Sequence, residues 1–518
     1  MRAPTPTGNS LLFRFGFICH SAAHHPEGDR VWAEVVQSWR TLEVAGFVIH
    51  HHPETLLRHH RRDGGVAVLI GDAFATPPGR TVESVLDTLL AAESDDLFFD
   101  SFYALSGRFE LLVLKGSARR AFHDPIGSRS LFYRGAGEFC LGSHAELIAH
   151  AFGIGKSEAV QELIGTAEYE SRTVKYLPGD LTLYEDLHGL APNNYYDITE
   201  RRSVRYWPRQ GRRSTTFDEF FGALDEYLAA LASHLRGRYS PILGVTGGID
   251  TRTLLAAFSR YELPVRGVTW LRRRRGPQED ELRLVEALTA QAGIEHTYLR
   301  PGPADDGQRA VRAMAKRNLG GFWRASRITA QMHERFAQAD AVFVRGYGAE
   351  IIRGFYNFRN PNPRALRGHP VRRRLRAWSG GVRGLAPNAR RGVIGAMTAG
   401  ELLTAYDSSM RGVRASEEHR RLGLAAFEGF IERANYDERL VRLGFDLDDL
   451  FYWEHRMGMW GSAKHNEMDP AALSISGFND RSVYEIAFGM NPRERLTKEL
   501  LLRVVRRYDE RMAAIPYL

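Results

Sequence analysis

The chain has 518 residues, of which 43% are hydrophobic and 25% charged, an ordinary balance for a globular protein and a length that favours two domains. No apolar run is long enough to span a bilayer, and the 2 cysteines are too few for a disulfide framework or a cysteine-based zinc site. The net charge of +8 reflects abundant arginine with little lysine, which indicates a bias of composition rather than a nucleic-acid-binding surface. We therefore expect a cytoplasmic protein that binds neither nucleic acid nor membranes.

The first part of the chain has the pattern of a β-rich domain. Apolar runs bounded by turn residues predict four strands, with a helix between the second and the third. These elements span residues 13–20, 66–71, 81–90, 107–114 and 138–142. Between residues 177 and 208 the sequence is rich in turn-forming residues, which predicts a linker and divides the chain into domains 1–205 and 206–518.

Residues 124–133 form an Asp-Pro-x-Gly turn that leads into a strand, and this segment resembles the DPxGxRPLYY segment of class II glutamine amidotransferase domains. Residues 105–109 and 141–148 match the same neighbourhood of that family. The resemblance implies an α+β domain with the αββα sandwich of Ntn hydrolases. The family's nucleophile is a cysteine directly after the initiator methionine, where this chain has Arg2, and the internal Cys19 has no free α-amine. We therefore expect a degenerate domain without glutaminase activity, retained as a structural relic or a substrate platform.

Strand and helix patterns alternate in the second half of the chain. Such alternation predicts a parallel sheet covered by helices, with ligands at the carboxyl ends of the strands. The predicted strands span residues 242–245, 265–270, 296–299 and 341–345, and the first helices span residues 250–261 and 279–293.

The most informative stretch is Thr246-Gly247-Gly248-Ile249-Asp250-Thr251, which follows the first of these strands. Two glycines carry the chain straight into a helix, so that backbone N–H groups and the helix N-terminus face one point where a phosphate can sit. A carboxylate at that point needs a divalent cation between itself and the phosphates, which makes Asp250 a candidate Mg²⁺ ligand. A plain strand-to-helix turn also uses glycines and remains the alternative.

This stretch resembles the SGGxDS pyrophosphate loop of ATP pyrophosphatases, in the variant of the asparagine synthetase and β-lactam synthetase family. A second segment, Gly346-Tyr347-Gly348-Ala349-Glu350, resembles the GYGxD loop of β-lactam synthetases with glutamate for aspartate. The resemblance implies an α/β C-terminal domain of the adenine nucleotide alpha hydrolase-like ATP pyrophosphatase type. It also implies ATP and Mg²⁺ as cofactors, with Asp250 and Glu350 as metal ligands. A glycine turn with an incidental surface glutamate is the alternative for the second segment.

Adenylation needs a positive group beside the departing pyrophosphate, and a lysine near the C-terminus serves in this family. Lys498 lies in a run similar to the PFLDR...NP...K..LR stretch of asparagine synthetases, Lys464 is the reserve, and a solvated helix lysine is the alternative. The β-lactam synthetase likeness suggests that Tyr347, with an unidentified carboxylate, deprotonates an amine. The residues expected around ATP are Leu243, Val245, Thr246, Gly247, Gly248, Asp250, Thr251, Val268, Gly346 and Gly348.

The resemblance implies a carbon–nitrogen ligase that adenylates a carboxylate, releases pyrophosphate and passes the acyl group to ammonia or an amine. We expect small-molecule or peptide substrates, an acceptor pocket or lid within residues 357–444, and a homodimer as one possible assembly. A tRNA-modifying ATP pyrophosphatase would share the first loop but also need catalytic cysteines or a nucleic-acid module, and neither is visible. A non-catalytic scaffold paralogue would explain the replacements at Thr246, Thr251 and Glu350.

Overall fold

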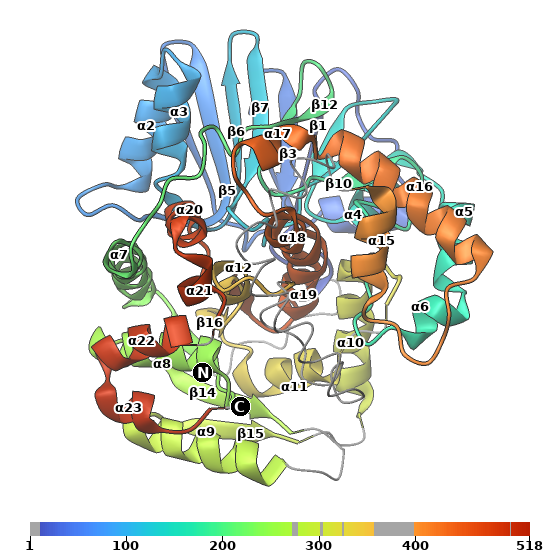
Figure 1. Cartoon of the computed structure of the whole chain (residues 1–518). Helices are drawn as coiled ribbons and strands as arrows, with labels where there is room; N and C mark the ends of the chain where they lie inside the picture. Colours follow the sequence, from blue (N-terminus) through green and yellow to red (C-terminus); the bar gives the residue numbers. More distant parts are fainter. Residues whose placement is uncertain are drawn as a thin grey trace.

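The computed structural model describes residues 11–271, 278–300, 304–323, 326–356, 398–497 and 499–517. Two antiparallel sheets occupy one end of the molecule and a parallel sheet the other, with a group of helices between them (Figure 1). Within these ranges, no helix is long and apolar enough to cross a membrane.

The N-terminal half is built on two six-stranded antiparallel sheets, ordered β10-β8-β9-β1-β3-β2 and β12-β11-β7-β6-β5-β4. The predicted strands at residues 66–71 and 107–114 are confirmed and lie within β5 and β6. The strands are β1 (Phe17–Ser21), β2 (Arg40–Val44), β3 (Phe47–His51), β4 (Leu57–Arg62), β5 (Gly65–Ala75), β6 (Leu105–Lys115), β7 (Ala118–His123), β8 (Phe132–Arg134), β9 (Cys140–Gly142), β10 (Leu187–Gly189), β11 (Asn194–Asp197) and β12 (Arg202–Arg205).

The two sheets pack face to face, and helices cover their outer faces. Along β5, Val66, Val68 and Ile70 point into the core between the sheets, whereas Ala67 and Leu69 point outward. Both faces of this strand are therefore buried, which is why its sequence is a continuous apolar run. The helices over the second sheet are α2 (Val82–Ala91) and α3 (Asp95–Phe102); those on the side of the first sheet are α1 (Arg30–Val36), α4 (Ala145–Phe152), α5 (Glu158–Ile164) and α6 (Ala167–Ser171). The layers run helix, sheet, sheet, helix, and membership of the Ntn hydrolases stays a prediction.

The C-terminal half contains a five-stranded sheet in which every strand pair is parallel, ordered β15-β14-β13-β16-β17. The four strands predicted from the alternating pattern are confirmed, and β17 is an addition. The strands are β13 (Ser240–Gly244), β14 (Arg266–Trp270), β15 (His296–Leu299), β16 (Ala341–Arg345) and β17 (Leu473–Ser476).

Helices cover both faces of the parallel sheet, as the alternation predicted. On one side lie α7 (Phe217–Leu235), α8 (Ile249–Arg260), α9 (Gln278–Ala292), α22 (Glu499–Tyr508) and α23 (Glu510–Ala514). On the other lie α11 (Arg327–Phe336) and α19 (Ser462–Met468), with α10 (Asp306–Asn318) packed against both. The remaining helices are α12 (Ala349–Ile352), α15 (Ala399–Asp407), α16 (Glu417–Arg433), α17 (Glu438–Arg442), α18 (Leu447–Phe451), the π-helix η2 (Tyr452–Gly461), α20 (Arg481–Gly489) and α21 (Pro492–Arg495).

The strand order reverses between β13 and β16. From β13 the chain passes through α8 to β14 and on to β15, and it then returns through α10 and α11 to β16 on the opposite side of β13. In open parallel sheets, ligands bind outside the carboxyl ends of the strands at such a reversal. The loops that follow β13 and β16 are therefore the place where this fold positions a ligand.

Buried polar contacts join the two halves. Arg108 on β6 makes a bidentate pair with Asp469 at 2.5 and 2.8 Å, and both side chains are 1% exposed. Asn479 donates to Asp124 at 2.8 Å and accepts from the Ile126 N–H at 3.0 Å, so the Asp-Pro-x-Gly turn docks on the C-terminal half. The division at residues 205 and 206 falls between β12 and α7 and stays a prediction.

Candidate functional site

The loop after β13 leaves the N-terminus of α8 open. Helix α7 is preceded by a capping box in which Thr216 and Glu219 satisfy the first N–H groups, but the N-cap residue of α8 is Gly248, which has no side chain to do so. Thr246 Oγ1 accepts from the Gly248 N–H at 3.3 Å and lies 3.1 Å from Thr251 Oγ1, which fixes the loop. Uncapped N–H groups at a helix N-terminus suit an anion.

The loop after β16 packs directly against the first one. A Cβ on Gly346 would lie 3.1 Å from Thr251 Cγ2 and 3.3 Å from Asp250 Cβ, so a larger residue here would crowd the first loop. Gly348 has a φ of +96°, and a Cβ there would lie 1.8 Å from the Phe478 carbonyl oxygen. Gly346 thus serves the close approach of the two loops, and Gly348 serves the approach of the second loop to Phe478. The structure brings the two predicted motifs together.

Asp250 is paired with an arginine that the sequence did not single out. Arg353 donates to its carboxylate from Nε at 3.1 Å and from the terminal Nη2 at 2.9 Å, and the two side chains are 11% and 20% exposed. Arg353 directly follows α12 and comes three residues after Glu350, so both side chains lie near the same neighbour, Asp250. Burial and the charge of Asp250 raise the pKa of Glu350 to about 7, although Arg353 opposes the rise.

The donor set of this crevice suits Mg²⁺. Magnesium usually takes one or two carboxylates and completes its shell with waters and phosphate oxygens. Asp250 and Glu350 supply two carboxylates from the two loops, and Glu350 Oε2 is shielded from solvent and has no hydrogen-bond partner among the described residues. The same ranges hold no group of three or more His, Cys, Asp or Glu side chains that could bind a metal. Two carboxylates suit a cation that takes its remaining ligands from phosphate and water.

We expect Glu350→Gln to change how stability depends on pH. Between pH 4.5 and about 7 the folded protein holds a proton on Glu350 that the unfolded chain releases, so the wild type loses stability as pH rises through this window. Glutamine stays neutral. We expect the stability of the variant relative to the wild type, measured by urea unfolding, to be roughly 2–3 kcal/mol more favourable at pH 8 than at pH 5. An unchanged difference would contradict the buried-carboxyl assignment, and the exposed Glu432→Gln is the control.

The ring of Tyr347 packs against Trp460 of η2 and His465 of α19. Its hydroxyl accepts from Arg345 Nη1 at 3.3 Å, and its ring centroid lies 5.5 Å from that of Trp460. Burial raises the pKa of this hydroxyl, with further contributions from Glu350 and Glu467. Tyr347 is therefore a neutral phenol at physiological pH, and these two carboxylates are the candidates for the unidentified partner.

Of the two candidate lysines, Lys464 is described and Lys498 lies outside the described residues. Lys464 on α19 forms an ion pair with Glu467, and its Nζ lies 4.3 Å from the ring centroid of Trp323. Burial lowers the pKa of Lys464, while Glu467 works in the opposite direction. Its main-chain carbonyl accepts from Arg345 Nη2 at 3.1 Å, which places Lys464 in the surroundings of Tyr347.

Three of the residues expected around ATP have their side chains in the core. Leu243 and Val245 face the core shared with α8, and Val268 faces the opposite one. Their backbone holds the strands in place: the Val245 N–H donates to the Val268 carbonyl at 2.8 Å. Arg2 and residues 357–397 lie outside the described residues. The remainder of the segment expected to form an acceptor pocket or lid, residues 398–444, contains α15, α16 and α17.

The two cysteines of the N-terminal half are both buried, in the core of the first sheet. Burial raises the pKa of Cys140 to about 12, and it raises that of Cys19 further. A thiol with such a pKa is not ionised at neutral pH, and the thiolate is the nucleophilic form. Neither cysteine is therefore poised for nucleophilic catalysis.

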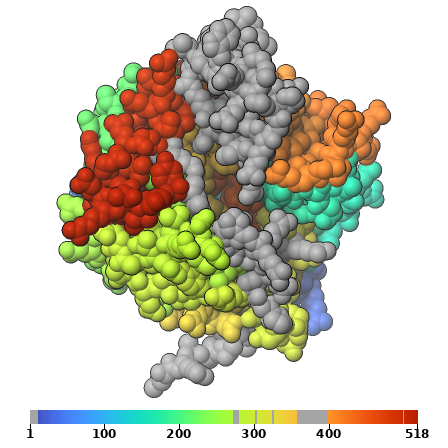
Figure 2. Space-filling model, turned by 60° about the horizontal axis from the view of Figure 1, so that its bottom comes forward, coloured from blue at the N-terminus to red at the C-terminus, as the bar shows by residue number. Residues whose placement is uncertain are grey.

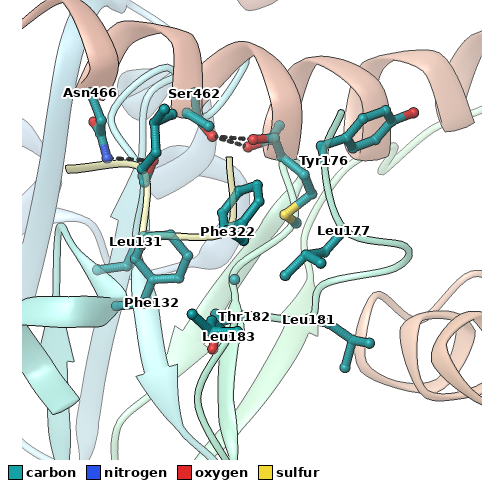
Figure 3. Close-up of a pocket in the computed structure, with 18 of the residues that line it drawn as sticks. Leu131, Phe132, Tyr176, Leu177, Leu181, Thr182, Leu183, Phe322, Ser462 and Asn466 are labelled. Carbon is teal, nitrogen blue, oxygen red and sulfur yellow. Dashed lines mark hydrogen bonds between the residues drawn. The ribbon is translucent and has the colours of Figure 1, made fainter. Parts of the chain in front are cut away.

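A cavity of about 50 Å³ lies between the two halves (Figure 3). Its walls are mainly apolar, with Leu131, Phe132 and Leu183 on one side and the polar Ser462 and Asn466 of α19 on the other. Ser462 Oγ donates to main-chain carbonyls of η2, and Asn466 Nδ2 donates to Ser130 Oγ at 3.2 Å. None of the predicted site residues lines this cavity.

The surface of the molecule is hollowed on one face, and segments of both halves border the hollow (Figure 2).

Comparison with known proteins leaves the family open. No family model matches the chain, and no curated protein matches it. Among solved structures, NMN synthetase from Francisella tularensis aligns at 15% identity over 27% of this chain and 59% of its own, with a TM-score of 0.18. The allosteric regulatory enzyme of purine biosynthesis aligns at 12% identity over 57% of this chain and 76% of its own, with a TM-score of 0.24.

A third solved structure is the glutamine phosphoribosylpyrophosphate amidotransferase from B. subtilis complexed with ADP and GMP. It aligns at 12% identity over 68% of this chain and 73% of its own, with a TM-score of 0.23. These TM-scores are too low to support an argument about shared fold or function, and the match to NMN synthetase spans less than two thirds of that enzyme.

Proposed function

We propose that the protein is an ATP-dependent ligase that adenylates a carboxylate, releases pyrophosphate and transfers the acyl group to ammonia or an amine, in the manner of asparagine synthetases. The observation that supports this most is the meeting of the two motif loops at the reversal between β13 and β16, where Asp250 and Glu350 come together beside an uncapped helix N-terminus. A single glycine turn would not need the second loop to press against it.

In this proposal the first loop binds the phosphates and the second loop faces the substrate. The Gly247 and Gly248 region and the N-terminus of α8 receive phosphate oxygens, and Asp250 with Glu350 would hold Mg²⁺. That ion would neutralise charge on the phosphates. Arg353 keeps Asp250 paired when phosphate is absent. Tyr347, a neutral phenol, orients the attacking amine and relays the proton of the amine to a carboxylate, for which Glu467 is the candidate once Glu350 holds Mg²⁺.

The proposal excludes a glutaminase step. Both cysteines in the chain are buried with raised pKa values, so no thiol is available to release ammonia from glutamine. The amine is then free ammonia, an amino substrate, or an amine of the same molecule as the carboxylate. The N-terminal half serves as a platform, since Arg108 and the Asp-Pro-x-Gly turn hold it to the C-terminal half.

The test is pyrophosphate release by the purified protein with ATP, Mg²⁺ and a panel of carboxylates and amines. We expect release that depends on a carboxylate, and AMP as the second product. Production of ADP and phosphate with every substrate, or no turnover with any of them, would count against the proposal. Turnover that needs tRNA would favour the tRNA-modifying alternative, and a protein that binds no nucleotide would be the scaffold paralogue.

A further inference from the structure

The π-helix η2 runs between the two halves, and it is ten residues long. Helices of this kind are rare and occur frequently at functional sites. One side of η2 is fixed to the N-terminal half: Trp453 Nε1 donates to the Pro125 carbonyl at 2.8 Å, and Glu454 accepts twice from Arg205 at 2.7 Å. The helix is thus held in a defined orientation by residues far away in the sequence.

The other side of η2 faces the loop after β16. Arg456 and Trp460 are four residues apart and lie on one face, with the guanidinium carbon of Arg456 4.3 Å from the Trp460 ring centroid. Trp460 in turn contacts the ring of Tyr347, which places this pair next to the proposed reacting groups.

Both side chains carry a donor that nothing in the described residues satisfies. Arg456 Nε and Trp460 Nε1 are shielded from solvent and have no hydrogen-bond partner among the described residues. The rest of the Arg456 guanidinium is surrounded by the rings of Tyr176 and Trp460 and interacts with the Tyr176 hydroxyl. A guanidinium is always charged, and a polar donor that is shielded from water costs free energy unless it has a hydrogen-bond acceptor. Two adjacent donors without a hydrogen-bond partner, one of them on a cation, favour the binding of an anion.

We infer that Arg456 and Trp460 form a subsite for a carboxylate of the acceptor substrate, the amine that receives the acyl group. This carboxylate accepts hydrogen bonds from Arg456 Nε and Trp460 Nε1. The inference rests on the proposed function for the reaction that takes place beside it. A carboxylate suits this subsite better than a phosphate, because one cation in aromatic surroundings balances one negative charge, and Glu350 nearby would repel a dianion. The phosphates of ATP have their own place at the N-terminus of α8.

Ligand-observed NMR on the full-length protein tests the subsite, with benzoate against benzamide and a dipeptide with a free C-terminus against its C-terminal amide. We expect the wild type to prefer the carboxylate of at least one pair, and Arg456→Gln to weaken that binding about tenfold or more, since hydrogen bonds to charged groups contribute about 1.5–3 kcal/mol. Trp460→Phe keeps the ring and removes one donor, so its loss should be smaller. Arg421→Gln, on the exposed face of α16, is the matched control.

The outcomes separate this inference from the proposed function. Equal binding of carboxylate and amide by the wild type, or unchanged carboxylate binding in Arg456→Gln, overturns the subsite. A loss of affinity for a non-hydrolysable ATP analogue in Arg456→Gln, without a loss for carboxylates, assigns Arg456 to phosphate and also overturns it. Carboxylate-selective binding that needs Arg456, in a protein that binds no ATP analogue, confirms the subsite while the proposed function fails. Selective binding of the free dipeptide but not of benzoate also supports the subsite and favours a peptide as the substrate class.

Discussion

Asp250→Asn should lower the rate of pyrophosphate release at least about 100-fold, because the variant removes the charge that would hold Mg²⁺ against the phosphates. Asparagine keeps the size of the side chain and can still accept from Arg353, so the fold should survive. The measurement is the rate of pyrophosphate release at saturating ATP over a range of Mg²⁺ concentrations. We expect the variant to need far more Mg²⁺ and not to regain the wild-type rate.

Asp306→Asn is the matched control for this experiment. Asp306 lies at the start of α10, its side chain is 97% exposed, and it pairs only with Arg309 among the described residues. The control should turn over like the wild type. If Asp250→Asn also turned over like the wild type, Asp250 would not contribute to the reaction, and the pairing with Arg353 would be its only role.

Gly348→Ala adds a single methyl group. Among the described glycines of the C-terminal half, we expect this substitution to lower the stability of the fold the most. The new Cβ would lie 1.8 Å from the Phe478 carbonyl oxygen and 2.4 Å from the Tyr484 hydroxyl, in a backbone conformation with φ of +96°. Overpacking costs about 1–3 kcal/mol or more, and a positive φ adds about 1–2 kcal/mol for a non-glycine residue. We expect a loss of about 3 kcal/mol or more in the free energy of unfolding by urea, together with loss of pyrophosphate release.

Gly412→Ala separates the two causes of that loss. Gly412 has a φ of +68°, but a Cβ there would meet no atom within 4 Å. This control should therefore lose only about 1–2 kcal/mol, the cost of the backbone conformation alone. Equal losses in the two variants would show that the close approach of the loop to Phe478 does not exist in solution.

The strands and the first helices of the parallel sheet could be predicted closely, because each is a local pattern with clear boundaries. The strand pattern at residues 341–345 coincides with β16, and that at residues 242–245 overlaps β13. The contact of the two motif loops also followed from the sequence, since the carboxyl ends of parallel strands lie on one edge. The fifth strand, β17, was missed because it lies more than a hundred residues after β16, beyond a helical stretch.

The partners inside the site could not be predicted, because they depend on tertiary contacts. Arg353 is one of many arginines, and nothing in its local sequence distinguishes it; only its position one turn after Glu350 could have pointed to it. The π-helix has no local sequence signature, and its position depends on contacts such as that of Glu454 with Arg205. Arg456 and Trp460 therefore became visible only once η2 was placed beside Tyr347.

The most direct test of the central claim is calorimetric titration of the wild type and of Asp250→Ala with a non-hydrolysable ATP analogue, with and without Mg²⁺. The claim is that the loops after β13 and β16 form one site for ATP and Mg²⁺. It predicts that the wild type binds the analogue more tightly with Mg²⁺, and that Asp250→Ala removes this gain and weakens binding at least about tenfold. No binding by the wild type, or equal affinity of the two proteins in Mg²⁺, would contradict it.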